Sequence, residues 1–522
     1  MLRERLLTTT HQPPDGTLPT ATSKRRTFED VLDLPEEQLR GISLTTLLTA
    51  CSNLFARHGA AAREDPHGTF ALSRQHDSLD YFCSHSWATS RWLKYVALLV
   101  HFNLGSALMA TMICNCVCAN VSLWCPHLVP WMAYPIQPDN ANGLAPLTAE
   151  IMLAPVFVTV LCTAHRFFPS RSLFLDIACI RQDSDTAKAD GIAALGAVLD
   201  RSQRMLVLCD AHYFSRLWCT FELAAYTKRE GGARIDLLPL HEPLVTLSLL
   251  LDLICFSVFG VVLGAAIELF DRDDLAALGQ QQEAMPFFVL LLHAPAQLFV
   301  VVAQVEACRM RAAVAELRRF KVEEARCHSD ADREELLKLI ARWFAGAEAD
   351  EDARRVGFHR FETYVRHAVA PNVAQSQGFY ARLLLAAGVI LTAPLFDTIC
   401  SRAFTPNHLL GALSTATLLV SLAMPFYLLV YAWSARVVLA LREKCAWPAA
   451  LSYSVGVLLN NVALVGWMGA WTLAGPTQLF APDYRLPQQD VLDETGRRLL
   501  ASNLTTVVTG LAVLAIAAVF KF

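Results

Sequence analysis

A carboxylate, a thiol and an indole lie close together in the segment Ser215–Leu223, as Glu222, Cys219 and Trp218. The pattern predicts a helix, and on a helix these three side chains share one face. The helix follows a predicted buried strand, Met205 to Cys209. Open α/β sheets bind ligands at the carboxyl ends of their strands. A carboxylate placed there can stabilise a developing positive charge, and an indole can stack on a flat ring.

Short apolar runs predict the strands that position this helix. They begin at Asp80, Ser172, Met205 and Ile235. The first run leads into a polar loop that contains Ser84, and the second ends in Asp176. An amphipathic stretch, Gly191 to Asp200, lies between the second and third runs. Alternating strands and helices indicate a parallel sheet with crossover helices, which would bring Ser84 and Glu222 to one cleft.

Three of these segments resemble the sequence boxes of the TIR domain, the Toll and interleukin receptor superfamily. Asp80-Tyr-Phe-Cys-Ser-His-Ser86 resembles the strand-A box, and Phe174-Leu-Asp176 resembles the strand-B signature. Trp218-Cys219 with Glu222-Leu223 resembles the box that begins helix C. The resemblance covers 79–95 and 169–242. It implies a flavodoxin-like sheet, split here by the inserted residues 96–168, and self-association through this domain.

Some members of that family hydrolyse NAD at the nicotinamide–ribose bond, and the resemblance then implies that Glu222 is catalytic. It implies a binding role for Ser84, Trp218, Cys219 and Asp176. NAD is expected as a substrate, and no bound cofactor is expected. The family's fifth strand and last helix are missing before residue 243, so the domain is either truncated or completed by 306–379. The fifteen cysteines include no CxxC pair, so no metal site is predicted.

Composition indicates a membrane protein. The chain of 522 residues is 54% hydrophobic and only 18% charged, with a mean hydropathy of +0.36. Its apolar residues form long blocks, and a bilayer-spanning helix needs about 20 such residues. We therefore expect an α-helical polytopic membrane protein of about eight spans carrying a small cytosolic α/β domain. The expected spans are 96–118, 147–166, 243–267, 286–305, 380–400, 408–433, 450–474 and 499–520.

Lys and Arg are concentrated in alternate connections, chiefly 165–242 and 306–379, which predicts that both termini and the α/β domain face the cytosol. The lipid bilayer is thus an expected partner. A net charge of −4 without a basic patch makes nucleic acid an unexpected one.

The predicted organisation has seven parts. These are a disordered tail (1–27), short amphipathic helices (28–78), the split α/β domain (79–95 with 169–242), membrane hairpins (96–168 and 243–305), a cytosolic helical segment (306–379) and a four-span region (380–522).

Two other functions fit the same sequence. A TIR-type scaffold would need no catalysis, and it would depend on the loop 177–190 rather than on Glu222. A transporter with a regulatory cytosolic domain would depend on Asp252 or Asp397, because a charge inside a bilayer is costly unless it serves a partner or a water path. The same carboxylates could instead make polar contacts that hold a helix bundle together.

Overall fold

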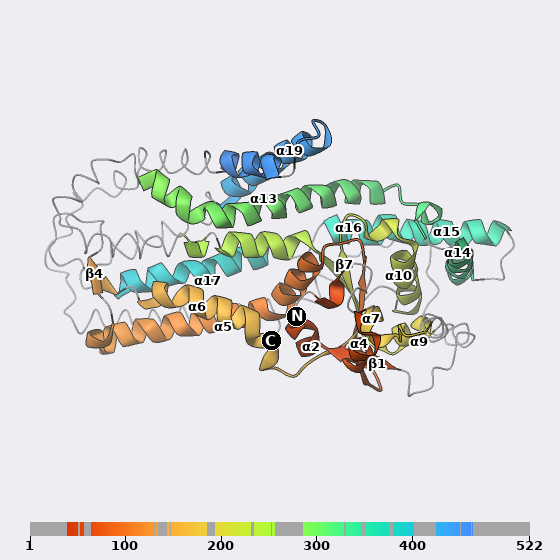
Figure 1. The fold of residues 1–522 in the computed structure, drawn as a ribbon, viewed down its shortest axis with the longest axis horizontal. Coiled ribbons are helices and arrows are strands. Elements are labelled where there is room, and N and C mark those ends of the chain that lie inside the picture. The colour runs from red at the N-terminus through yellow and green to blue at the C-terminus, as the bar shows by residue number, and fades with distance from the viewer. Residues whose placement is uncertain are drawn as a thin grey trace. The chain divides into compact units, whose positions relative to one another are not determined.

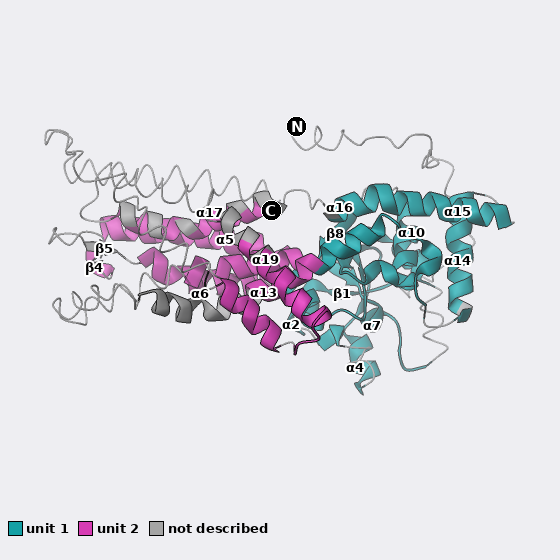
Figure 2. Cartoon of the chain, turned by 90° about the horizontal axis from the view of Figure 1, so that it is seen from above, with its two compact units in different colours: residues 1–97, 169–240, 309–377 teal, residues 98–168, 241–308, 378–522 magenta. Residues whose placement is uncertain are grey.

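The fold is that of a computed structural model in which most of the helices and the whole main sheet are described (Figure 1). The described residues are 39–50, 53–56, 64–129, 131–133, 144–146, 148–184, 194–230, 234–251, 253–255, 285–327, 330–346, 351–374, 379–400, 424–448, 450–460 and 462. The predicted tail 1–27 lies outside them, as do residues 185–193 of the loop region. The chain divides into two compact units, shown in teal and magenta in Figure 2.

Unit 1 comprises residues 1–97, 169–240 and 309–377 and is built around a sheet. Its strand order is β2-β1-β6-β3-β7-β8. The strands are β1 (Arg40–Ser43), β2 (Arg74–Gln75), β3 (Leu79–His85), β6 (Ser172–Phe174), β7 (Ser202–Cys209) and β8 (Ile235–Pro239). The four strands predicted from sequence are present, and β6, β3, β7 and β8 run parallel. Their carboxyl ends therefore lie at one edge.

The prediction of a wholly parallel sheet is wrong, because β1 and β2 extend it in antiparallel fashion. Ile42 of β1 pairs with Leu173 of β6, and Gly41 pairs with Arg74 of β2. Short helices were predicted over 28–78 and neither strand was, because both strands are too short to show a clear alternation. The helical turns α2 (Leu44–Thr49) and α4 (Pro66–Ala71) are present in this region.

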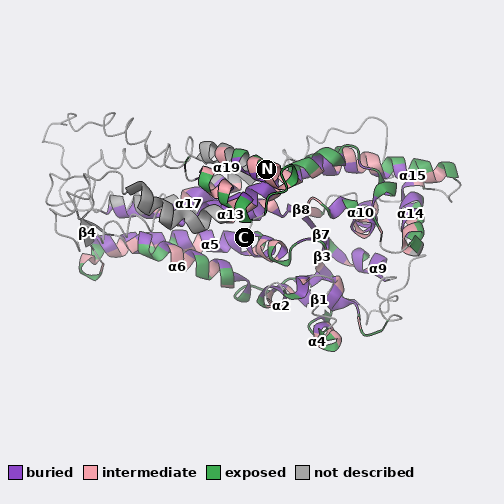
Figure 3. Cartoon of the chain, turned by 45° about the horizontal axis from the view of Figure 1, so that its top comes forward, coloured by how far each residue is buried: buried purple, intermediate pink, exposed green. Residues whose placement is uncertain are grey.

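Central strands β3 and β7 are buried along most of their length, as Figure 3 shows in purple. Their apolar runs match what a parallel strand covered on both faces requires. Helices α7 (Asp176–Cys179), α9 (Leu195–Asp200) and α10 (Leu217–Glu230) belong to the same unit. The buried residues of α9 and α10 join one hydrophobic core with β3, β6 and β7.

Residues 309–377 complete this unit. They include the end of α13 (Met285–Leu317), α14 (Asp330–Ala345), α15 (Glu351–Tyr364), a π-helical turn (Val365–Val369) and α16 (Ala370–Ala374). The backbone N–H of Leu217 donates to the carbonyl of Arg326, and that of Arg326 donates to Ser215. Residues 309–377 therefore belong to the same compact unit as the sheet.

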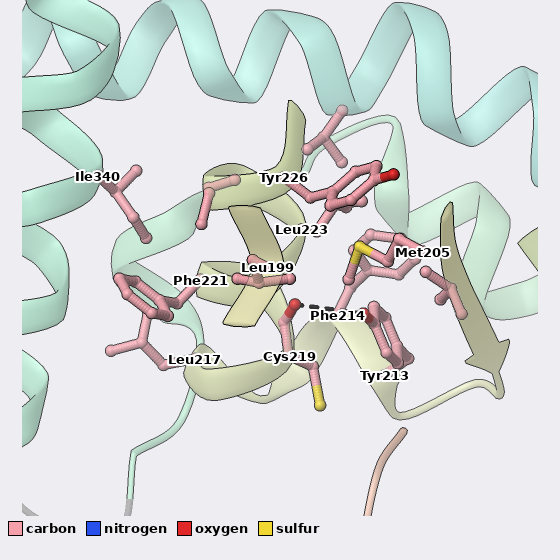
Figure 4. Packing of buried hydrophobic residues seen from close by; sticks show 14 of the residues in the cluster. Leu199, Met205, Tyr213, Phe214, Leu217, Cys219, Phe221, Leu223, Tyr226 and Ile340 are labelled. Carbon is pink, nitrogen blue, oxygen red and sulfur yellow. Dashed lines mark hydrogen bonds between the residues drawn. The ribbon is translucent and has the colours of Figure 1, made fainter. Parts of the chain in front are cut away.

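Aromatic rings connect the added helices to the sheet's own core. Phe221 of α10 lies 5.1 Å from Trp343 of α14, measured between ring centroids. Phe320 lies 6.2 Å from both Phe214 and Phe361. Figure 4 shows Leu217, Phe221 and Tyr226 of α10 in this core, together with Phe214 and with Ile340 of α14. Burial of such rings contributes about 1.5–3 kcal/mol each, so the added helices stabilise the unit substantially.

Unit 2 comprises residues 98–168, 241–308 and 378–522. Its described helices include the rest of α5 (Arg91–Trp124), α6 (Thr148–Thr163), α17 (Phe379–Ile399) and α19 (Met424–Glu443). A short hairpin, β4 (Trp131–Ala133) with β5 (Leu144–Pro146), lies between α5 and α6 in the chain. Polar contacts join the helices. Asn103 donates to the carbonyl of Leu161 at 2.8 Å, and Asn115 donates to Thr392 at 3.1 Å.

The predicted fold class of an eight-span membrane protein is wrong for the part of the chain that the structure describes. Two helices there are long and apolar enough to cross a bilayer, Arg91–Trp124 and Thr148–Arg166. Helices α13, α17 and α19 overlap three other predicted spans and are not among these two. The predicted spans 243–267, 408–433, 450–474 and 499–520 lie wholly or partly outside the described residues. Apolar blocks also form buried core helices, which hydropathy does not distinguish from membrane spans.

Candidate functional site

Ser84, Tyr213 and Glu222 form a hydrogen-bonded chain at the carboxyl edge of the parallel strands. Ser84 is the sixth residue of β3, Tyr213 begins a 3₁₀ turn just after β7, and Glu222 lies on α10. Ser84 Oγ donates to Oε2 of Glu222 and lies 2.6 Å from Tyr213 Oη. Tyr213 Oη in turn lies 3.2 Å from the carbonyl oxygen of Cys219. Strands β3 and β7 are neighbours, which is why residues so far apart in sequence meet here.

The protonation state of Glu222 decides the direction of this chain. An ionised carboxylate only accepts, so the order is then Tyr213 to Ser84 to Glu222. A protonated carboxyl can donate, and the order becomes Glu222 to Ser84 to Tyr213 to the Cys219 carbonyl. Each hydroxyl has one hydrogen to give, so only the second order lets Tyr213 donate fully to Cys219.

Burial raises the pKa of Glu222 to about 8, although its side chain keeps some exposure. The hydrogen bond from Ser84 opposes this rise, as does the charge of Arg216, while the charge of Asp176 adds to it. Without a ligand, Glu222 is therefore mostly protonated at neutral pH. A cation bound beside it would favour the ionised form.

The other predicted binding residues lie at different positions around α10 and α7. Cys219 is buried, and its thiol donates to the carbonyl of His85 at 3.4 Å. Burial raises its pKa well above the ordinary value, so it is a neutral thiol. Trp218 packs against the hydrophobic core, with its ring edge-on to Phe221 at 5.9 Å. Cys219 therefore joins the hydrogen-bonded chain of Glu222 through its carbonyl, which lies beside Tyr213 Oη, and Trp218 packs against the core.

Asp176 begins α7, with one residue between it and the end of β6, at the same edge of the sheet. Its Oδ2 accepts from the indole Nε1 of Trp87 at 3.0 Å, and its Oδ1 accepts from the backbone N–H of Ile177 at 2.8 Å. The predicted loop after it is helical as far as Cys179. In the part of this loop after Cys179, the carboxylate of Asp183 accepts from the guanidinium of Arg181 at 2.5 Å.

A second polar pair, which the sequence analysis missed, lies at this edge. Thr89 Oγ1 donates to Oδ2 of Asp210, the residue that follows β7. Oδ1 of the same carboxylate accepts from the backbone N–H of His212 at 3.2 Å. Tyr213, Trp87 and this pair all stand in the polar loops that follow predicted strands. That position was the sequence signal that could have identified them.

Lys94, on the first turns of α5, is the most unusual charged group of the unit. Its side chain is 0% exposed, and its Nζ has no hydrogen-bond partner among the described residues. It lies 5.4 Å from the ring centroid of Phe55 and 5.3 Å from that of Trp87. Burial lowers its pKa to about 8. His85 next to it is buried too, and burial lowers its pKa well below the ordinary value, which makes it neutral.

Asp397 makes hydrogen bonds within unit 2. It is buried on α17 and accepts from the backbone N–H of Ala149 at 3.3 Å and of Glu150 at 3.0 Å. These N–H groups belong to the first turn of α6, so Asp397 caps that helix from a neighbouring one. Asp252, the other carboxylate of the transporter hypothesis, lies outside the described residues.

Over the described residues, no group of three or more His, Cys, Asp and Glu side chains could hold a metal ion. No protein-family model, curated protein or solved structure matches the chain.

Proposed function

We propose that this chain is a membrane-tethered signalling protein whose α/β unit self-associates and hydrolyses NAD at the nicotinamide–ribose bond, with Glu222 as the catalytic residue. The observation that carries the proposal is the hydrogen-bonded chain of Tyr213, Ser84 and Glu222 at the carboxyl edge of the parallel strands. This chain includes a carboxyl whose pKa lies near neutral pH, at the edge where α/β sheets bind their ligands. The resemblance of three sequence boxes supplies the choice of NAD.

The reaction needs a carboxylate beside the ribose. Nicotinamide leaves as a neutral molecule, so no strong general acid is required, and an oxocarbenium-like centre forms at the ribose carbon. The positive nicotinamide ring lowers the pKa of Glu222 when NAD binds, and the carboxylate then stabilises the developing charge. Water adds to the ribose carbon, and Glu222 takes its proton. The products are ADP-ribose, nicotinamide and one proton.

The other predicted residues assist in different ways under this proposal. Ser84 and Tyr213 donate along the chain to the ionised form of Glu222 and so hold its carboxylate in place. Cys219 fixes α10 to the end of β3 through its thiol contact with the carbonyl of His85. Asp176 provides a second acceptor at the same edge, and Trp218 supports α10 from the core side.

Nicotinamide release by the purified full-length chain tests the catalytic proposal. Glu222→Gln keeps the shape of the side chain and its bond to Ser84 but removes the negative charge, so release should be lost. Glu335 is an exposed glutamate of α14, and Glu335→Gln should leave the rate unchanged. Release that persists in Glu222→Gln refutes the role of Glu222. If the folded wild type releases no nicotinamide, a non-catalytic scaffold or a transporter remains.

Helices α5 and α6 are the membrane tether in this proposal. The chain leaves unit 1 at Ala97 and returns at Pro169, as a hairpin that crosses the bilayer twice would require. The hairpin exposes large apolar side chains, among them Val117 at 56% and Phe167 at 79%. The large exposed apolar residues on the two helices and the following turn are Trp92, Ile113, Val117, Trp124, Ile151, Met152, Val158, Phe167 and Phe168. Unit 1 then lies on the cytosolic side, with both termini.

Flotation of the full-length chain with liposomes tests the tether. Val117→Asp should reduce the membrane-bound fraction, because an aspartate within a bilayer costs about 2.5–3.5 kcal/mol. Val356, a half-exposed valine of α15 in unit 1, provides the matched control, and Val356→Asp should float like the wild type. Equal flotation of all three proteins would contradict the assignment of α5 to the bilayer.

A further inference from the structure

Lys94 is a buried cation without a counter-ion in contact. Its ammonium group is inaccessible to solvent and makes no hydrogen bond among the described residues. Buried charges in proteins are normally paired, because an isolated one is costly to remove from water. The charges of Asp176 and Asp210 act on Lys94, but both carboxylates make their hydrogen bonds to other groups. Asp176 accepts from Trp87 and Ile177, and Asp210 accepts from Thr89 and His212.

Two aromatic rings take the place of a counter-ion. The ammonium lies between Phe55, which is buried, and Trp87, which is partly exposed. Cation–π contacts of this kind stabilise a cation less than a charged partner would. The indole of Trp87 is held over Lys94 by its hydrogen bond to Asp176 at 3.0 Å.

The surroundings of Lys94 favour an anion. Lys94 belongs to the first turns of α5, a helix of 34 residues whose first turn contains no acidic side chain. The positive end of the helix dipole and its N–H groups therefore lie beside the lysine without a compensating carboxylate in that turn. Arg91 in the same turn adds a further positive charge. The loop Ser86–Ser90, which follows β3, leads into this helix at the carboxyl edge of the sheet.

We propose that Lys94 and the first turn of α5 bind the diphosphate group of a nucleotide ligand, which displaces the Trp87 ring and pairs with the Lys94 ammonium. The aromatic cage is the unliganded state of this site. The burial that lowers the pKa of Lys94 to about 8 still leaves the group mostly charged at neutral pH. The inference goes beyond the hydrolysis of NAD, because diphosphate binding at Lys94 requires no bond cleavage at Glu222.

Calorimetric titration of the full-length chain with inorganic pyrophosphate and, separately, with ADP-ribose tests this site. Lys94→Met keeps the length and the apolar stem but removes the charge. It should weaken binding about tenfold or more, since hydrogen bonds to a charged group contribute about 1.5–3 kcal/mol. The matched control is Lys338→Met, at an exposed lysine of α14 in the same unit, and it should bind like the wild type.

Trp87→Phe provides a second test that does not depend on the folding of Lys94→Met. It keeps a ring over Lys94 but removes the N–H that bonds Asp176, so the ring moves aside more easily and binding should tighten several-fold. Lys94-dependent binding of pyrophosphate, or of ADP-ribose alone, supports the site, and the second case shows that the nucleoside is required. Equal affinity in wild type and Lys94→Met, unchanged or weaker affinity in Trp87→Phe, or no binding of either probe overturns it. These binding measurements do not depend on NAD cleavage by Glu222, so failure of the diphosphate site and failure of the catalytic proposal can be told apart.

Discussion

Ser84 on β3 and Glu222 on α10 stand 138 residues apart in the chain and share one hydrogen bond. The inserted hairpin accounts for much of this separation, because α5 and α6 fall between β3 and β6. The bond nevertheless forms because β3 lies between β6 and β7 in the sheet and α10 begins just after β7. The pair links a hydroxyl that donates a hydrogen bond to a carboxyl whose pKa that bond lowers.

Ser84→Ala should shift the pH dependence of nicotinamide release towards higher pH. The Ser84 hydroxyl lowers the pKa of Glu222, which burial has raised to about 8, so its removal raises that pKa further. If the ionised carboxylate is the active form, the rate at pH 7 falls and recovers as the pH rises. Rates measured from pH 6 to about 9.5 check this. A uniform loss at every pH would show instead that Ser84 acts only through folding.

Stability should fall as the pH rises because of Glu222. Its pKa in the folded chain, about 8, is higher than the ordinary value of 4.5. The contribution of protonated Glu222 to stability is therefore fully present below about pH 4.5 and is lost as the pH rises through about 8. Glu222→Gln cannot ionise, so its unfolding midpoint should exceed that of the wild type more at pH 8.5 than at pH 5.5. The midpoints of both proteins in urea at the two pH values provide the measurement, and a constant difference would contradict the shifted pKa.

Phe361→Ala should destabilise unit 1 and so reduce its activity at elevated temperature. Phe361 is 0% exposed and contacts Phe320 and Phe344 in the core that residues 309–377 share with the sheet. Removing a buried phenylalanine costs about 3–5 kcal/mol. Val356→Ala on the exposed side of α15 should change stability by less than about 0.5 kcal/mol. Similar unfolding curves for the two variants would mean that the 309–377 segment is not part of the unit.

Asp397→Asn should be tolerated and Asp397→Ala should not. An amide oxygen can still accept from the N–H groups of Ala149 and Glu150, whereas alanine leaves them without this acceptor. Loss of a helix cap costs about 0.5–2 kcal/mol. The thermal unfolding midpoints of the two variants distinguish these cases. If both variants unfold like the wild type, the capping role is wrong and the carboxylate has another purpose.

The sequence predicted the parts of unit 1 whose patterns are local. The runs that begin at Asp80, Ser172, Met205 and Ile235 became four parallel strands, because apolar runs bounded by polar loops leave few alternatives. Strands β1 and β2 escaped prediction because they are short and are stabilised by pairing with a distant strand. In the described part of the chain, fewer helices than predicted are long and apolar enough to span a bilayer, and apolar helices also pack inside proteins. Val301 and Val305 of α13, for example, pack against Ala435 and Val438 of α19.

Only the part of the site that follows local sequence patterns was predicted. Glu222, Ser84 and Asp176 follow predicted strands or share a helix face with recognisable neighbours, and the first two are in contact. Tyr213 and Lys94 were missed because their environment depends on tertiary packing. A tyrosine in a loop and a lysine at the start of an apolar helix are ordinary in sequence. Only the folded chain shows that both are fully buried.

Nicotinamide release by the full-length chain, reconstituted in liposomes at increasing protein density, tests whether Glu222 cleaves NAD in an assembled α/β unit. Release by the wild type should rise per molecule as the chains cluster, because assembly through the α/β unit is part of the proposed function. Glu222→Gln should release none at any density. Release by Glu222→Gln at the wild-type rate, or none by a folded and clustered wild type, would show that the proposed catalysis is wrong.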